Sequence, residues 1–259
     1  MNLQTPFPQE NCLPHDNRDV FRATDEGRSW RDRALAPLTR DEQVLLGRHL
    51  TDPDQPILDC GCGAGRIAYN LVQQGFTNVT GFDYAQEMLM AAEAARPPGA
   101  AVRFDLADAT DLSLYPDNAF QHALYLQQII SFIPRDRLPD LLRHAYRIVR
   151  PDGRLFFAAL NMNGRRINGG LSKFVRLARA LRGEPQQPQA LPWLTLGQSF
   201  NWRFLSGAQP TTYWFRQEEL VANLAEAGLE ILEVTTSREL RERRDGPDGN
   251  LYVVCRKPL

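Results

Sequence analysis

Three glycines at alternate positions separate a short apolar run from a helical pattern in the stretch ILDCGCGAGRIAYNL, residues 57–71. Such a turn brings backbone N–H groups and a helix N-terminus against a ligand, because a Cβ would block the approach or the left-handed backbone. The spacing is Gly61-x-Gly63-x-Gly65, whereas a dinucleotide-binding fingerprint has its third glycine one residue later, where this chain has Arg66. The Gly-Lys-Ser/Thr of a phosphate-binding loop is missing too. The turn therefore predicts a ligand without a pyrophosphate.

Strand-like and helix-like segments alternate over most of the chain. Apolar runs predict the strands, at residues 57–60, 78–83, 101–105, 120–127, 154–160, 229–234 and 250–258. Helical patterns stand between them, at residues 66–74, 86–96, 135–149 and 217–227. This alternation with short turns predicts an α/β fold with a mostly parallel, doubly wound sheet.

Two parts of the chain fall outside this alternation. Residues 1–50 are predicted as an N-terminal arm and a helix, the helix starting at a capping box formed by Thr39 and Glu42. Residues 51–259 then form the main domain, interrupted over 161–212 by a stretch rich in Pro, Gly, Arg and Trp. A long insertion in a compact fold is usually functional. We expect it to overhang the ligand crevice as a lid.

Acidic residues lie at the end of the second predicted strand and just after the third. Asp83 lies 18 residues past Gly65, where a carboxylate commonly binds ribose hydroxyls. Asp108 follows the third strand and is predicted to reach a purine edge, with Asp105 and Asp111 as alternatives. Open α/β sheets bind ligands at the carboxyl ends of their strands. A nucleoside at that edge accounts for the glycines and both acids.

Composition excludes several classes of protein. The net charge of −1 gives no global sign of nucleic acid or membrane binding. Four cysteines without a Cys-x-x-Cys do not make a secreted disulfide framework, and Cys60 with Cys62 makes at most half a zinc site. No metal is therefore expected. The first residues do not read as a signal peptide, and no apolar run approaches the ~20 residues of a membrane span. We expect a soluble, cytoplasmic protein.

The chain from Leu45 to Pro258 resembles the class I S-adenosylmethionine-dependent methyltransferases, with a domain similar to types 11 and 25. The segments that carry the resemblance are ILDCGCGAGR, VTGFDYAQEML, FDLADATDLSL, FQHALYLQQIISFI and IVRPDGRLFFAAL, in this order. One departure is Gln121, where the family often has an acid. The resemblance implies a Rossmann-like sheet of seven strands whose last strand is antiparallel.

It also implies S-adenosyl-L-methionine as the cofactor and a set of residues around it. In such folds the glycine turn lies against the methionine moiety, Asp83 holds the ribose, and Asp108 with Ala109 holds the adenine. Asp59 is expected to brace the turn or to meet the amino group of the donor, and the alternative is a core-facing position without a contact to the donor. The full set expected to bind the cofactor is Asp59, Gly61, Cys62, Gly63, Gly65, Asp83, Tyr84, Met88, Asp108, Ala109 and Gln127.

Methyl transfer from a sulfonium needs alignment and desolvation of the acceptor rather than a fixed catalytic motif. The fourth strand is followed by Gln127-Gln128-Ile129-Ile130, so the motifs of DNA amino-group and C5-cytosine methylation are absent. The leading hypothesis is methylation of O, N or C of a small molecule under the lid. The alternative is an RNA (tRNA) methyltransferase, favoured by the basic stretch LSKFVRLARALR at 171–182. A non-catalytic nucleoside-binding module is a third possibility.

Overall fold

The computed structural model describes residues 31–165 and 212–259, together with a few isolated residues between these ranges. The arm at 1–18, most of the basic stretch 171–182 and most of the predicted lid at 161–212 therefore lie outside the described residues. Between the two ranges the structure describes a short pair of strands, β6 (Thr195–Leu196) and β7 (Ser199–Phe200).

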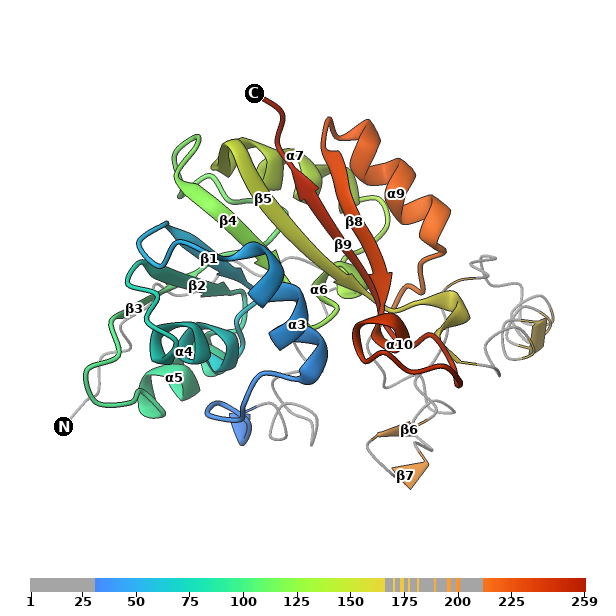
Figure 1. Cartoon of the computed structure of the whole chain (residues 1–259), viewed down its shortest axis with the longest axis horizontal. Coiled ribbons are helices and arrows are strands. Elements are labelled where there is room, and N and C mark those ends of the chain that lie inside the picture. Colours follow the sequence, from blue (N-terminus) through green and yellow to red (C-terminus); the bar gives the residue numbers. More distant parts are fainter. Residues whose placement is uncertain are drawn as a thin grey trace.

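A seven-stranded sheet forms the centre of the fold, and Figure 1 shows its strands side by side from β3 at one edge to β8 at the other. Across the sheet the strands are β3 (Val102–Leu106), β2 (Val79–Asp83), β1 (Ile57–Cys60), β4 (Phe120–Tyr125), β5 (Val149–Ala159), β9 (Leu251–Arg256) and β8 (Glu230–Thr236). The first five strands pair in parallel, and β9 pairs antiparallel with both β5 and β8. The predicted seven-stranded sheet with an antiparallel last strand is confirmed.

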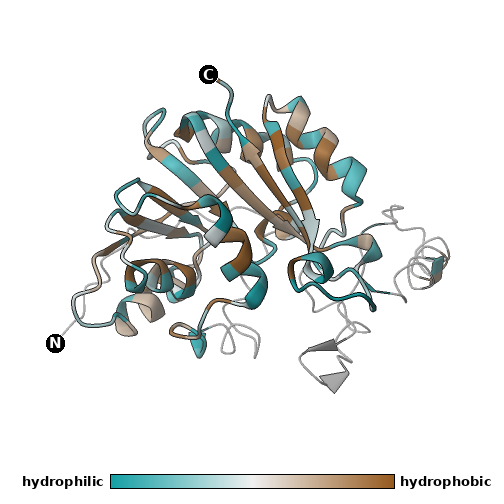
Figure 2. Ribbon diagram, viewed as in Figure 1, coloured by the Kyte–Doolittle hydropathy of each residue, from teal (hydrophilic) through white to brown (hydrophobic). Residues whose placement is uncertain are grey.

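Helices cover both faces of the sheet. They are α3 (Arg40–His49), α4 (Arg66–Gln73), α5 (Gln86–Ala94), α6 (Ile129–Phe132), α7 (Leu138–Ile148), α9 (Gln217–Glu226) and α10 (Ser237–Leu240), with a 3₁₀ turn, η1, at Met162–Gly164. Neighbouring strand residues separate into two cores, as the two-residue period of a strand requires. Ile57 belongs to the core that includes α3, α4 and α5, whereas Leu58 belongs to the core that includes α7 and α9. Figure 2 shows the apolar residues concentrated along the strands.

Several elements are shorter than their sequence patterns predict. The strand predicted over 120–127 ends at Tyr125, because Gln127 and Gln128 adopt φ values of 58° and 63° that cannot continue a ladder. The helix predicted over 135–149 begins only at Leu138, which places Pro139 in the first turn, where its missing N–H is tolerated. The helix predicted over 86–96 ends at Ala94, shortly before Pro97.

The N-terminal helix α3 is attached to the sheet through charged side chains. The predicted capping box is present, with Thr39 accepting from the N–H of Glu42 and the Glu42 carboxylate accepting from the N–H of Thr39. Glu42 also forms a two-bond pair with Arg66, at 2.6 and 2.8 Å, and both side chains are buried. Buried Asp41 accepts from Arg241 and from the Tyr252 hydroxyl.

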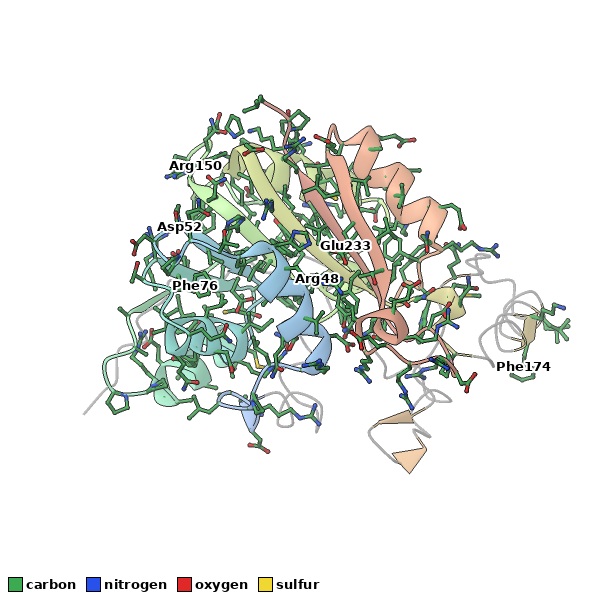
Figure 3. The ribbon with its side chains drawn as sticks, viewed as in Figure 1. Arg48, Asp52, Phe76, Arg150, Phe174 and Glu233 are labelled. Atoms are coloured by element: carbon green, nitrogen blue, oxygen red, sulfur yellow. The ribbon has the colours of Figure 1, made fainter. Side chains whose placement is uncertain are left out.

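The other end of α3 reaches the far edge of the sheet. Arg48 pairs with Glu233 of β8 at 2.6 Å, and Figure 3 shows these two labelled side chains together. His49 Nε2 lies 2.7 Å from the second carboxylate oxygen of Glu233. Among the described helices, none combines the length and the apolar character that a membrane crossing needs.

Substitution of Glu42 tests whether its pair with Arg66 stabilises the docking of α3. We expect Glu42→Ala to lower the free energy of unfolding by about 3–5 kcal/mol, because it leaves the buried Arg66 guanidinium unpaired. The measurement is urea unfolding followed by circular dichroism. The matched control is Glu93→Ala, which removes a more exposed pair with Arg96 and should change stability by no more than about 1 kcal/mol. Equal midpoints for the two variants would contradict this account of α3.

Candidate functional site

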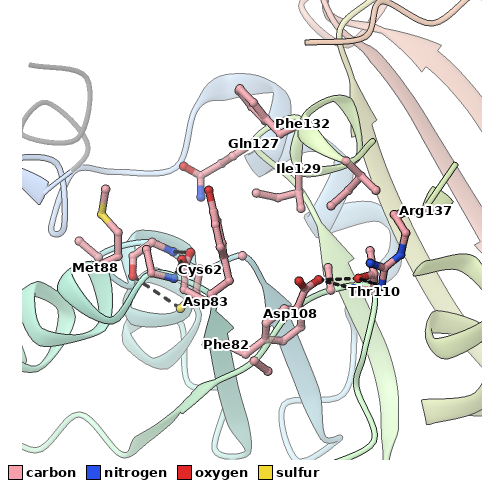
Figure 4. A pocket seen from close by; sticks show the side chains of 18 of the residues that line it. Cys62, Phe82, Asp83, Met88, Asp108, Thr110, Gln127, Ile129, Phe132 and Arg137 are labelled. Carbon is pink, nitrogen blue, oxygen red and sulfur yellow. Dashed lines mark hydrogen bonds between the residues drawn. The ribbon is translucent and has the colours of Figure 1, made fainter. Parts of the chain in front are cut away.

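A pocket of about 370 Å³ lies at the carboxyl ends of the parallel strands, where the turns after β1, β2, β3 and β4 converge. Figure 4 shows it from close by, with Asp83, Met88, Asp108 and Gln127 around the space. Most residues expected from the sequence line this pocket: Gly61, Cys62, Gly63, Asp83, Tyr84, Met88, Asp108, Ala109 and Gln127. Asp59 and Gly65 do not.

The glycine turn is shaped by its neighbours on both sides. Gly61 has a φ of +65°, and a Cβ there would lie 2.6 Å from the Ile129 side chain. Gly65 is the N-cap residue of α4, with a φ of +84°. A Cβ there would meet Tyr69 and Phe104 at 2.9 Å, so this glycine serves the packing of the core. Gly63 differs: its φ is +54°, and a Cβ there would have no protein atom within 4 Å. The backbone of Gly63 is therefore the part of the turn that leaves space for a ligand.

Asp83, at the end of β2, both holds the turn and faces the pocket. Its Oδ2 accepts from the Gly63 N–H at 2.8 Å, and its Oδ1 accepts from the Ala85 N–H at 2.9 Å. Burial raises the pKa of Asp83 to about 6, although these backbone donors oppose the shift. Each carboxylate oxygen has two lone-pair sites, so Asp83 retains the capacity to accept from hydroxyl groups of a ligand.

Asp59 lies beneath the turn rather than in the pocket. Its side chain is buried, and Oδ2 accepts from the Ala68 N–H at 3.2 Å, which attaches β1 to the first turn of α4. Burial raises the pKa of Asp59 to about 7, and the nearby Arg66 guanidinium opposes this rise. Of the two roles predicted for Asp59, these contacts correspond to bracing the turn.

Asp105 lies near the end of β3, Asp108 and Asp111 follow the strand, and the surroundings of the three acids distinguish them. The Asp105 carboxylate accepts hydrogen bonds from Arg103 and from the Tyr115 hydroxyl. Asp111 is exposed, and its carboxylate accepts from the Ser113 N–H. Asp108 is the one of the three that lines the pocket. Its Oδ1 accepts from both the N–H and the hydroxyl of Thr110 at 2.8 Å, and Arg137 donates to the same hydroxyl at 2.8 Å.

The structure adds an apolar wall to the pocket. Ile129, Phe132, Ile133 and Pro134 line it from α6 and the loop that follows. The run IISFIP after the fourth strand carries this signal in the sequence, although it reads equally well as core. Arg33, Asp136 and Arg137 place charged groups at the same pocket, and no motif in the sequence indicates them.

The described cysteines are buried, and the described histidines lie away from the pocket. Cys60, Cys62 and Cys255 are buried free thiols, and burial raises the pKa of each well above its usual value. In the described part of the chain no group of three or more His, Cys, Asp or Glu side chains could hold a metal ion. His49 and His122 are paired away from the pocket, with Glu233 and Gln55 respectively. His144 lies in α7, so the described histidines leave the pocket without an imidazole base.

Comparison with known proteins finds methyltransferases. A family model described as a methyltransferase domain matches residues 57–153. The ubiquinone biosynthesis O-methyltransferase of Citrobacter koseri is 30% identical over 174 residues, which are 64% of this chain and 68% of that protein.

Two solved structures share the fold. An S-adenosylmethionine-dependent methyltransferase from Methanosarcina mazei gives a TM-score of 0.63 at 22% identity, covering 83% of this chain and 97% of that one. The 1,6-didemethyltoxoflavin-N1-methyltransferase of Burkholderia thailandensis, crystallised with 1,6-didemethyltoxoflavin and S-adenosylhomocysteine, gives a TM-score of 0.62 at 20% identity. That alignment covers 98% of this chain and 94% of the other.

The two buried carboxyl groups predict how stability depends on pH. Their pKa values, about 7 for Asp59 and about 6 for Asp83, lie above the value of about 3.9 in an unfolded chain. The folded state thus binds more protons between about pH 4 and pH 7, and the free energy of unfolding falls as pH rises through this window.

Asp59→Asn keeps an oxygen for the Ala68 N–H but cannot ionise. We therefore expect the difference in free energy of unfolding, variant minus wild type, to be larger at pH 8 than at pH 5. Urea unfolding at the two pH values measures this difference. Asp245→Asn, at an exposed position, is the control. An Asp59→Asn variant with the same relative stability at both values would rule out the burial effect at this position.

Proposed function

The chain belongs to the S-adenosylmethionine-dependent methyltransferase family, and we propose that it transfers the methyl group to an O, N or C atom of a small-molecule acceptor. The observation that carries the proposal is the arrangement of the open face of Gly63 with the carboxylates of Asp83 and Asp108 around one pocket. The names of the Citrobacter and Burkholderia relatives, which both refer to small molecules, support the acceptor class.

The residues of the pocket fit S-adenosylmethionine, which supplies a methyl group activated on a sulfonium when it is bound. We assign the methionine moiety to the turn at Gly61, Cys62 and Gly63, the ribose hydroxyls to Asp83, and the adenine to Asp108 and Ala109. Asp83 suits the ribose because its two oxygens, fixed by backbone N–H groups, can each accept a further hydrogen bond. Tyr84, Met88 and Gln127 complete the proposed binding site.

The proposed role of the chain in the reaction is alignment and exclusion of water. Ile129, Phe132 and Ile133 form an apolar wall of the same pocket, which would desolvate an acceptor. Positioning of two reactants can contribute roughly 7–11 kcal/mol toward the barrier. No imidazole lines the described pocket, so we assign no general base to the described residues.

We also propose that the protein acts in the cytoplasm and has a main domain over 51–259, preceded by the arm and helix of 1–50. The three described cysteines, all free thiols, support a reducing compartment. The proposed lid at 161–212 joins the main domain after β5, beside the apolar wall.

Gly63 provides a test of the donor site that separates binding from folding. We expect Gly63→Ala to weaken the binding of S-adenosylhomocysteine, measured by isothermal titration calorimetry, by at least about tenfold, or about 1.4 kcal/mol, because the new Cβ occupies ligand space. Gly75→Ala is the matched control, since its φ of +96° is also left-handed and its Cβ also has no protein atom within 4 Å. Both variants should lose about 1–2 kcal/mol of stability from backbone strain. Unchanged binding in Gly63→Ala would remove the turn from the donor site.

The acceptor class is tested with radiolabelled S-adenosylmethionine. We expect label to enter one or more compounds in a panel of catechols, other phenols, carboxylic acids and nitrogen heterocycles, and not bulk tRNA. Gly63→Ala, at matched enzyme concentration and with the donor below its dissociation constant, should lower the label about tenfold. Label in tRNA, together with heparin retention that falls steeply with salt, would instead favour the RNA alternative drawn from the basic stretch at 171–182.

A further inference from the structure

The helix α6, which lines the pocket, is joined to both places where the chain leaves and re-enters the described fold. Ser131 of α6 is buried, and its hydroxyl accepts from the Leu160 N–H at 2.9 Å. Its carbonyl accepts from the Tyr213 N–H at 2.8 Å. A single buried residue of α6 therefore bonds to the chain just before and just after the insertion.

These two chain segments also bond to each other. The Phe215 N–H donates to the Leu160 carbonyl, and the Met162 N–H donates to the Phe215 carbonyl, both at 2.8 Å. They form a parallel bridge between Asn161 and Phe215. We call residues 160–164 and 212–216 the stem.

Arg135, three residues after α6, fixes the loop to the stem. Its guanidinium lies over the rings of Tyr213 and Phe215, at 4.5 and 5.4 Å from their centroids. It also pairs with Glu219 in the first turn of α9 at 3.0 Å, and the Tyr213 hydroxyl donates to the same carboxylate at 2.6 Å. Arg135 thus brings together the pocket wall, the stem and α9 through one planar group, which suits arginine better than lysine.

The opposite side of α6 touches the glycine turn. Ile129 packs so closely on Gly61 that a Cβ there would lie 2.6 Å from its Cδ1. A continuous line of contacts therefore runs from the glycine turn through Ile129 and Ser131 to the stem. Packed contacts of this kind transmit ordering, because a ligand that restricts one member restricts its neighbours.

We propose that Arg135 is a positioning residue that holds the α6 wall between the glycine turn and the stem, so that occupation of the donor pocket is transmitted to the stem. This inference rests on the proposed donor site. It adds that the stem, which itself does not line the pocket, responds to the donor. The link gives the enzyme a route by which donor binding prepares the region next to the insertion.

The test follows amide hydrogen exchange in the full-length protein, with and without S-adenosylhomocysteine. In the wild type, the ligand should slow exchange at peptides covering 59–66 and 127–133, and also at the stem. In Arg135→Met, the protection of the stem should be lost, and the dissociation constant for S-adenosylhomocysteine should rise about three- to tenfold. Arg135→Lys, which keeps the cation near the rings and Glu219, should restore part of both effects.

Arg143→Met is the matched control, because Arg143 is an exposed arginine of α7 paired only with Asp140 among the described residues. Its exchange pattern and affinity should match the wild type. A stem that gains no protection in the wild type, or keeps it in Arg135→Met, would overturn the role of Arg135 while leaving the donor site intact. A wild type that neither gains exchange protection at 59–66 nor gives a heat of binding with S-adenosylhomocysteine would overturn the donor site itself, and this inference with it.

Discussion

The hydrogen bond from the Gly63 N–H to Asp83 is the contact on which the rest of the site depends. Beside it, the Cys62 N–H donates to the Phe82 carbonyl at 2.8 Å, so the pairing of β1 with β2 continues past the strand into the turn. The neighbouring strand thereby fixes the backbone of the turn. The carboxyl group that shapes the turn is also the one proposed to bind the ribose, and it lines the pocket.

The electrostatic environment of this turn reaches into the N-terminal helix. Asp59 and Asp83 are buried on adjacent strands, where desolvation disfavours their charged forms. Arg66 opposes this at Asp59, and Glu42 of α3 forms the buried pair with Arg66. Residue 42 lies outside the segment 57–153 that the family model matches. Helix α3 therefore contributes to the site through charge, although none of its residues lines the pocket.

Much of this arrangement follows from local sequence patterns. The glycine spacing and the acids at the ends of β2 and β3 predicted the pocket, because parallel strands bring their carboxyl ends to one edge. The same patterns did not separate the glycines: Gly65 resembles Gly63 in sequence, but only its contacts with Tyr69 and Phe104 show that it serves the core.

Features that depend on long-range contacts could not be predicted in this way. The left-handed backbone of Gln127 and Gln128 has no glycine or asparagine to signal it, so the strand was expected to run on. The apolar wall of α6 has the composition of a buried helix, and its role depends on which side faces the pocket. The position of Arg135 over Tyr213 joins residues that are far apart in the sequence.

The placement of β9 has a consequence for how the protein is made. This strand lies between β5 and β8, and β8 joins the sheet only through it. The partners of Asp41 in α3, Arg241 and Tyr252, are separated from it by 200 and 211 residues. During translation, the glycine turn and the first five strands emerge from the ribosome well before residues 251–256. The half of the sheet that carries the pocket must therefore wait, with the edge of β5 unpaired and Asp41 without its partners, and chaperones can bind during that interval.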